Sequence, residues 1–174
     1  LQVEKFKMET LRSVILATQP GEWVASVDLK DAYFHVAVRE SHRKYLRFAL
    51  KGKCYQYRVL PFGLSSSPRV FTKVLAPVMA ALRTEGVHIH PYLDDILIRA
   101  QSPTELRLSV ARTLAALQRT GYIINQEKSQ LQPTQDLVYI GGRLRPDLGQ
   151  VFLPEDRKKA LVKLVRSFLV GSYR

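Results

Sequence analysis

Short apolar segments along the chain indicate where its strands lie. Period-two alternation or continuous apolar stretches predict strands at residues 23–29, 35–38, 45–50, 55–60, 137–140 and 150–153. The two strands around Lys51-Gly52-Lys53 are expected to form a hairpin. A second hairpin is indicated where one apolar segment ends at Tyr92 and the next begins at Ile96.

Apolar residues three and four positions apart predict helices. The first covers residues 6–18 and ends at Pro20-Gly21. The second begins at Ser67-Pro68, with serine as the N-cap and proline at the first helical position. Pro77 lies inside this second helix and is expected to bend it.

Two more helices are expected in the second half of the chain. One begins with the capping box Ser102-Pro103-Thr104-Glu105 and stops at Gly121. The other starts at Pro154 and is amphipathic. We expect its apolar face to turn inward; this face consists of Leu161, Leu164, Val165 and Phe168.

The order of these elements is helix, strands, helix, hairpin, helix, strands, helix. Because hairpins dominate, we predict an α+β fold in which helices cover one face of an antiparallel sheet. The 174 residues suffice for one domain with a core, and no internal repeat or low-complexity tract interrupts them.

The clearest chemical signal is the tetrapeptide Tyr92-Leu93-Asp94-Asp95 between two apolar segments. Adjacent carboxylates repel each other, and their burial is costly unless a cation compensates for it. Asp28, at the end of another predicted strand, supplies a third carboxylate, and together they predict a magnesium site for phosphoryl transfer. Either a turn lets both neighbours reach the metal, or Asp94 is the ligand and Asp95 supports it. The alternative is a polar hairpin turn, since aspartate is common in turns.

A net charge of +12 and a pI near 10 predict a polyanionic partner. Cations and aromatic rings alternate between residues 39 and 58, a combination that suits nucleic acid. The residues are Arg39, His42, Arg43, Lys44, Arg47, Lys51, Lys53 and Arg58, with Tyr45, Phe48, Tyr55 and Tyr57. Two other interpretations of this basic stretch are that it binds an anionic membrane surface, or that it is a solvated pair of basic strands without a partner.

Several classes are excluded or disfavoured. The single cysteine, Cys54, allows no internal disulfide and no cysteine-based zinc site. No apolar segment approaches the roughly 18 residues of a membrane span. The mixed, charged start without a methionine resembles no signal peptide and indicates a piece of a longer protein. The single cysteine is compatible with an intracellular location, in the cytoplasm or nucleus. His88 and His90 alternate on a strand without a third ligand, which favours a structural or surface role.

Five segments together carry a family resemblance. Tyr92-Leu93-Asp94-Asp95 resembles the Tyr-x-Asp-Asp motif of reverse transcriptases. Residues 28–34 and 60–68 resemble the first and second palm motifs of that family. Gly121-Tyr122 with Asn125 and Lys128 resembles the fourth, and residues 138–142 resemble the primer-grip region. Five motifs in the family's order are highly specific. Within that family, residues 42–48 and 60–64 are most similar to DIRS-type retrotransposons.

The resemblance implies the fold and the reaction. It implies a polymerase palm with partial fingers over residues 1–153 and the start of a thumb or connection helix over residues 154–174. The activity would be RNA-directed DNA synthesis, in which a dNTP is added to a primer on an RNA or DNA template. The cofactor would be two Mg²⁺ ions, with Mn²⁺ as a substitute. Oligomeric state is left open.

The resemblance also implies catalytic and metal-binding roles. Asp28 and Asp94 would bind both metal ions, with Asp95 beside them. Lys128 is a candidate proton donor to pyrophosphate, although a surface lysine is an alternative reading. Two other functions compete with this one. The chain could be a catalytically silent remnant that only binds nucleic acid, or an RNA-copying polymerase of the viral kind.

Substrate-binding roles follow from the same resemblance. Tyr33 would be the steric gate that selects deoxynucleotides, or alternatively a core aromatic residue. Gly63 would let the backbone approach the nucleotide or template closely. Phe62 stands where retroviral enzymes carry glutamine, so that hydrogen bond is absent here. The residues expected to contact the primer are Tyr92, Tyr139, Gly141 and Gly142. The family's triphosphate-gripping hairpin lies upstream of the first palm motif, and only 27 residues precede Asp28.

Overall fold

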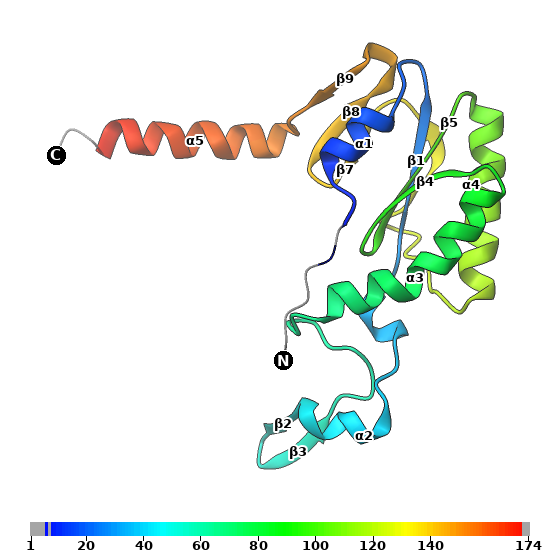
Figure 1. The fold of residues 1–174 in the computed structure, drawn as a ribbon. Coiled ribbons are helices and arrows are strands. Elements are labelled where there is room, and N and C mark those ends of the chain that lie inside the picture. Colours follow the sequence, from blue (N-terminus) through cyan, green and yellow to red (C-terminus); the bar gives the residue numbers. More distant parts are fainter. Residues whose placement is uncertain (1–5, 7, 172–174) are drawn as a thin grey trace.

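A computed structural model of the chain describes the backbone of residue 6 and of residues 8–171. Four strands form a central antiparallel sheet in the order β4-β5-β1-β6 (Figure 1). Their bounds are Trp23–Asp28 for β1, His88–Tyr92 for β4, Asp95–Ala100 for β5 and Gln130–Thr134 for β6. This sheet is the scaffold on which the candidate site is built.

Two helices cover one face of the central sheet, α3 (Ser67–Thr84) and α4 (Pro103–Arg119) (Figure 1). Alternate residues of the strands point to them, since side chains on a strand alternate between faces. Val27 of β1 and Ile96 and Ile98 of β5 are fully buried in this main core, with Phe71 of α3. The predicted α+β fold with helices on one face of an antiparallel sheet is confirmed.

A smaller layer covers part of the opposite face. It consists of the helix α1 (Leu11–Ala17) and a three-stranded sheet of β7 (Leu137–Tyr139), β8 (Gly142–Arg145) and β9 (Gln150–Phe152), with a 3-10 turn, η3 (Pro146–Leu148), before β9. Val24 and Leu97, from the central sheet, pack with Leu144 and Tyr139 in this second core. The layer leaves one end of this face uncovered by the second core, and Asp28 and Asp95 lie there.

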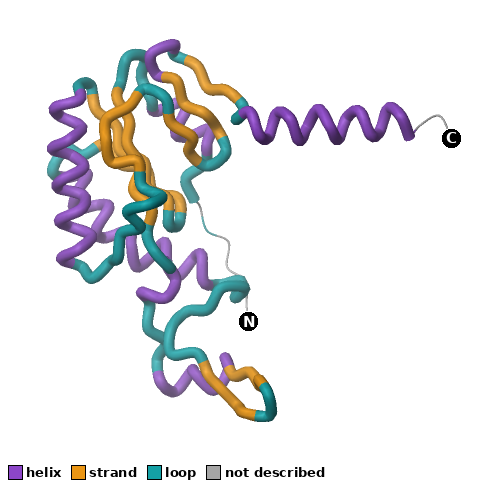
Figure 2. Tube along the Cα trace, turned by 180° about the vertical axis from the view of Figure 1, so that it is seen from behind, coloured by secondary structure: helices purple, strands orange, loops and turns teal. Residues whose placement is uncertain are grey.

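Two parts extend from the body. Between β1 and α3 the chain forms η1 (Ala32–His35), α2 (Glu40–Arg43), η2 (Lys44–Leu46) and the hairpin of β2 (Arg47–Leu50) and β3 (Lys53–Gln56). This hairpin and the C-terminal helix α5 (Glu155–Gly171) project away from the rest (Figures 1 and 2). Every residue of β2 and β3 is exposed.

The C-terminal helix differs from the expectation. Leu161, Leu164 and Val165 were expected to face inward, but each is about half exposed, and Phe168 is 69% exposed. Within the described residues the helix leaves the body instead of packing on it (Figure 2). The amphipathic pattern identified the apolar face correctly, but a pattern does not say what covers that face.

The N-terminal helix is shorter than predicted. The expected helix 6–18 occupies only Leu11–Ala17, and position 7 lies outside the described residues. Thr10 stops it at the N-terminus, because its hydroxyl accepts a hydrogen bond from the amide of Ser13 at 3.1 Å. Of the positions predicted to be helical, residues 8–10 therefore lie before the first turn of the helix.

The predicted strand at 35–38 is wrong. Residues Ala32–His35 form a 3-10 helix, started by Asp31 in the left-handed region with φ of 52° and stabilised by a contact of 3.1 Å between His35 Nδ1 and the Ala32 carbonyl. The segment that follows makes only an isolated bridge, between Ala37 and Val59.

The second helix begins as expected, but its cap differs. Ser66, not Ser67, is the N-cap residue. Ser67 is fully buried, and its hydroxyl donates to the carbonyl of Pro61 at 2.9 Å. Ser67 therefore holds the loop before the helix. The strands β6 and β8 were not predicted, since Pro133 and Gly142 weaken their sequence signals.

Candidate active site

Strand register brings the three aspartates to one end of the central sheet. Asp28, the last residue of β1, lies directly opposite Asp95, the first residue of β5. Asp94 occupies the two-residue turn between β4 and β5, and its carbonyl accepts a hydrogen bond of 2.9 Å from the amide of Leu29. Three carboxylates from two separate segments therefore meet; we call them the carboxylate cluster. The predicted convergence of Asp28 with the Tyr92–Asp95 turn is present in the structure.

The side of the sheet on which the cluster lies follows from alternation. Val27 and Leu29 face the helical core, so Asp28 between them faces the opposite side. Ile96 faces the helices, so Asp95 before it also points away from them. Asp28 and Asp95 are half-buried, whereas Asp94 in the turn is exposed. The cluster is therefore reachable from solvent on the face without helices.

Electrostatics show that the negative charge of the cluster is poorly compensated. Burial, together with the charges of Asp94 and Asp28, raises the pKa of Asp95 to about 6. Burial also raises the pKa of Asp28; a hydrogen bond from Asn125 opposes this shift, and the charge of Asp94 adds to it. A bound cation would relieve this repulsion.

A loop after α4 holds the backbone of Asp28 in place through hydrogen bonds. The amide of Asp28 donates to the hydroxyl of Ser129 at 3.0 Å, and its carbonyl accepts from the amide of Asn125 at 2.9 Å. The Ser129 hydroxyl in turn donates to the Asn125 carbonyl at 2.7 Å. These bonds fix the end of β1 against residues 125–129.

The same loop carries Lys128 to the cluster. Its positive charge lowers the pKa of both Asp28 and Asp95, although burial outweighs it in each case. Lys128 is exposed, so its amine is free to approach a bound phosphate. The sequence identified Lys128 and Asn125 by motif, but it gave no signal for Ser129, whose role depends on the fold of the loop.

An aromatic group stands beside the cluster. Burial raises the pKa of Tyr33, and the charges of Asp94 and Tyr92 raise it further, which places the Tyr33 phenol near the turn that holds Asp94. The Tyr33 ring contacts Phe62 at 4.9 Å and Phe71 at 5.8 Å between centroids. Tyr33 thus contacts the core on one side and approaches the cluster on the other.

Phe62 and Gly63 lie on the exposed loop before α3. The ring of Phe62 is 60% exposed and also contacts Phe34 at 5.4 Å. Gly63 has φ of 84°, a conformation that favours glycine, and a Cβ built there would meet nothing within 4 Å. The loop therefore offers an apolar ring and open backbone next to Tyr33.

Tyr139 is buried and hydrogen-bonded to the central sheet. It is 3% exposed, and its hydroxyl donates to the carbonyls of His90 at 2.7 Å and Asp95 at 3.2 Å. Gly142 is also buried, against Leu11 and Val151. Both were expected to contact the primer; both are buried in this structure, and their contact with a primer stays a prediction. Gly141 is half-buried, and Tyr92 is half-buried and packs against the second core.

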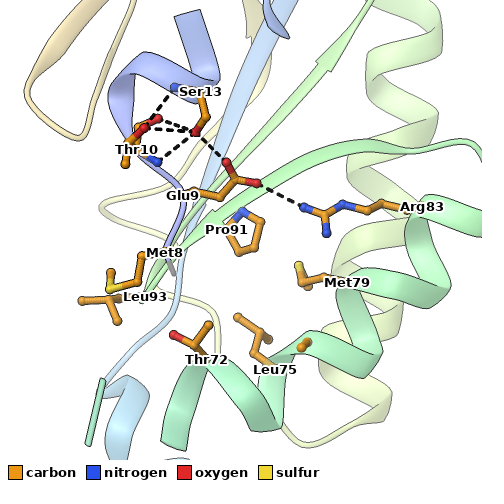
Figure 3. A pocket seen from close by; sticks show the side chains of 11 residues that line it. Met8, Glu9, Thr10, Ser13, Thr72, Leu75, Met79, Arg83, Pro91 and Leu93 are labelled. Atoms are coloured by element: carbon orange, nitrogen blue, oxygen red, sulfur yellow. Dashed lines mark hydrogen bonds and ion pairs between the residues drawn. The ribbon is translucent and has the colours of Figure 1, made fainter. Parts of the chain in front are cut away.

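Leu93 points away from the cluster. Its φ of 55° is unusual for a branched side chain and holds the tight turn. Its side chain lines a cavity of about 380 Å³ between the N-terminal segment and α3 (Figure 3). Met8, Leu75 and Met79 form apolar walls of this cavity, and Glu9 lies on its rim, where Arg83 contacts it at 3.5 Å. The sequence gave no sign of this cavity.

The histidines of β4 lie as expected for structural or surface roles: His88 is exposed, and His90 is held within the sheet. His90 accepts a hydrogen bond of 3.0 Å from Nε of Arg99, and Arg99 also pairs with the buried Glu22 at 2.7 Å. Burial lowers the pKa of His90, and the charge of Arg99 acts in the same direction. Arg99 needs a neutral imidazole as its acceptor, which argues against a metal at this position.

The cluster fits Mg²⁺ only together with a substrate. Among the described residues, no group of three His, Cys, Asp or Glu side chains is arranged to hold an ion by itself. In nucleotide-binding sites, however, one or two carboxylates usually bind Mg²⁺ while phosphates and water complete its shell. Asp28 and Asp94 satisfy that lesser requirement, and their hard oxygens suit the ion.

Comparison with known proteins places the chain in a family. The family described as reverse transcriptase (RNA-dependent DNA polymerase) matches residues 2–144. A template-copying polymerase domain is the class that this match defines. The chain belongs to the reverse transcriptase family.

Curated relatives are polyproteins of retroviruses and retrotransposons. The chain is 32% identical over 131 residues to the Gag-Pro-Pol polyprotein of Human T-cell leukemia virus 2, a match that covers 70% of this chain and 9% of that protein. It is 29% identical to the Gag-Pol polyprotein of an avian leukosis virus, over 75% and 9% of the two chains. A Tf2-3 transposon polyprotein of Schizosaccharomyces pombe is 27% identical over 75% and 10%. The chain thus spans about a tenth of the length of these relatives.

A solved structure shares the fold. A foamy viral protease-reverse transcriptase, determined in complex with double-stranded DNA, matches with a TM-score of 0.77 and 19% identity. The match covers 91% of this chain and 26% of the viral chain. Separately, no helix in the described part of the chain is long and apolar enough to cross a membrane.

Proposed function

We propose that this chain is the palm and part of the fingers of an RNA-directed DNA polymerase, which adds dNTPs to a primer on an RNA or DNA template. The observation that carries the proposal is the register of β1 and β5, which sets Asp28 opposite Asp95 with Asp94 in the adjoining turn. The division at residue 153, with a thumb or connection helix after it, belongs to the same proposal.

In this proposal each residue near the cluster has a distinct task. Asp28 and Asp94 would hold Mg²⁺ or Mn²⁺, and two such ions supply charge stabilisation for in-line displacement. Asp95 adds negative charge beside them. Lys128, beside the cluster, would donate a proton to the departing pyrophosphate.

Selection of the sugar would depend on the aromatic group. The Tyr33 ring is held by Phe71 and Phe62, so it is rigid enough to exclude a 2′-hydroxyl from the space before Asp94. Phe62 would contact the nucleotide or template through its exposed ring, and Gly63 through its backbone. A polymerase that copies RNA into RNA must accept ribonucleotides, so it would need space for the 2′-hydroxyl where the Tyr33 ring lies.

The decisive experiment is primer extension on RNA and DNA templates with dNTPs and Mg²⁺. We expect the variant Asp94→Asn to lose on the order of 10³-fold in rate, because loss of a metal ligand removes several kcal/mol of transition-state stabilisation. Asp31→Asn is the matched control, since Asp31 is exposed and its side chain makes no capping bond. Equal extension by Asp94→Asn and the wild type would refute the proposal.

A second candidate, a catalytically silent nucleic-acid-binding remnant, is favoured by the hairpin of β2 and β3. Its exposed rings Phe48 and Tyr55 stack at 5.5 Å among basic residues, so it can bind nucleic acid without chemistry. This candidate predicts strongly salt-dependent binding but no incorporation. Template-dependent incorporation by the chain would exclude it.

The narrower assignment to DIRS-type retrotransposons is also a proposal, supported by residues 42–48 and 60–64. Sequencing of the genomic locus tests it, because a tyrosine recombinase should be encoded beside the polymerase. Intracellular action, in the cytoplasm or nucleus, is proposed on the same basis. Fractionation of cells with an antibody against the chain tests that location.

A further inference from the structure

An arginine from α5 lies on the turn between β7 and β8. Because Phe152 of β9 pairs with Arg143 of β8, the chain after β9 runs past Gly142 and Gly141. Arg157, in the first turns of α5, therefore reaches Gly141. A Cβ built on Gly141 would overlap Nη1 of Arg157 and lie 2.8 Å from its Cζ. The missing side chain at position 141 makes the room for this guanidinium.

Among the residues that the structure describes, no neighbour neutralises the charge of Arg157. Arg143 is bound in a bidentate pair to Asp136, with a bond of 2.7 Å, and Arg145 is paired likewise with Asp147. Arg157 is exposed, and it makes no ion pair or hydrogen bond among the residues that the structure describes. The nearby Glu155 pairs instead with Lys158 at 3.6 Å.

The turn that carries this charge adjoins the carboxylate cluster. Tyr139, at the start of the turn, hydrogen-bonds to the carbonyl of Asp95. Ile140 and Tyr92, the residue that precedes the Leu93-Asp94 turn, both pack against the second core. A strand whose end lies at the cluster therefore passes close to this turn, and a planar guanidinium binds phosphate with two parallel hydrogen bonds.

We propose that Arg157 binds a backbone phosphate of the primer strand near its 3′ end, and that Gly141 provides the space for the guanidinium. This rests on the proposed polymerase function and adds to it a residue outside the five matching motifs. Arg157 links α5 to the turn, so the helix contributes to primer binding through its first turns.

The test is the binding of a labelled primer–template without dNTP or metal, so that chemistry does not enter. The logarithm of the binding constant falls linearly with the logarithm of the salt concentration, and each phosphate contact adds about 0.9 to the steepness of this slope. Loss of one contact therefore corresponds to roughly eightfold in affinity at 0.1 M salt. Arg157→Ala should therefore weaken binding of the primer–template by roughly eightfold and lower the slope by about one. Arg157→Lys should keep most of the slope. The template strand alone should bind Arg157→Ala as it binds the wild type.

Lys159→Ala is the matched control, because Lys159 is exposed on the same helix and its removal changes the charge equally. We expect it to weaken binding less than twofold. Equal losses for Arg157→Ala and Lys159→Ala, or no measurable binding by the wild-type chain, would overturn the inference. Extension by the wild type and its loss in Asp94→Asn would still uphold the polymerase function in either case.

A double-mutant cycle tests the role of Gly141. The methyl group in Gly141→Ala should displace the guanidinium and weaken binding, but it should have little further effect in the Arg157→Ala background. The φ of 87° makes the substitution strained, so unfolding by urea is measured alongside to show that both variants are folded. Additive losses of affinity would contradict the proposed contact.

Discussion

The carboxylate end of the central sheet and the two projecting parts of the chain are held in different ways. At the carboxylate end, strand pairing, the hydroxyl of Tyr139 and the loop at Asn125 fix the position of each functional group. The hairpin of β2 and β3 and the helix α5 are instead exposed over most of their apolar residues. The geometry of the carboxylate cluster is thus built into the body, whereas the projecting parts expose apolar side chains that contact with a partner would bury.

The largest expected difference between these regions is in stability. Phe71 is fully buried in the main core, so Phe71→Ala should lower the free energy of unfolding by about 3–5 kcal/mol. Phe48, in the hairpin, is 42% exposed, and Phe48→Ala should cost less than about 1 kcal/mol. Urea unfolding of both variants measures this contrast. Similar losses would show that the hairpin packs on the body in solution.

The same contrast explains how much the sequence could predict. Asp28 and Asp94 were found because each follows an apolar strand and because five motifs occur in order. The position of Ser129 and the burial of Tyr139 could not be found in this way, since both depend on contacts across more than forty residues. Such contacts leave no local pattern.

The errors in the fold have the same physical origin. Periodicity gave the apolar face of α5, but the contact that would cover Leu161 or Leu164 lies outside any local window. The predicted strand at 35–38 failed because Asp31 adopts a left-handed conformation and starts a 3-10 turn. Likewise β8 begins at Gly142, whose burial under Leu11 is a long-range contact that propensity does not reveal.

The second prediction concerns the hydroxyl that supports the catalytic turn. Tyr139→Phe removes the hydroxyl that donates to the partly buried carbonyls of His90 and Asp95, so it should destabilise the protein by about 1–3 kcal/mol. Thermal unfolding measures this loss. Tyr45→Phe is the control, since the Tyr45 side chain is 74% exposed and should tolerate the change. An unchanged melting temperature in Tyr139→Phe would show that water replaces the hydroxyl.

The third prediction is a pH dependence without metal. The pKa of Asp95 is raised from 3.8 to about 6, so the folded state holds its proton more tightly than the unfolded state. Stability from this group is therefore fully present below pH 3.8 and is lost as the pH rises through 6. The loss is on the order of 1 kcal/mol, because solvent screens a half-exposed carboxyl.

Asp95→Asn isolates this contribution. The variant should lack that part of the decline in stability between pH 4 and pH 7, measured by urea unfolding in the presence of a chelator. Asp31→Asn again serves as the control, since its carboxyl is exposed. A decline of the same size in Asp95→Asn and the wild type would show that the burial of Asp95 does not govern it.

The smallest effect separates the two hairpin turns. Lys51 and Leu93 both have positive φ, at 49° and 55°, and asparagine tolerates this region better than either. Lys51→Asn creates an Asn-Gly turn, which should slow amide exchange in β2 and β3 about twofold, equivalent to roughly 0.4 kcal/mol. Leu93→Asn should stabilise the protein less than Lys51→Asn does, or should destabilise it, because the Leu93 side chain lines the cavity with Leu75 and Met79 (Figure 3). If both turns gained equally, the contacts of Leu93 would contribute nothing, and the catalytic turn would be as independent of the body as the projecting hairpin.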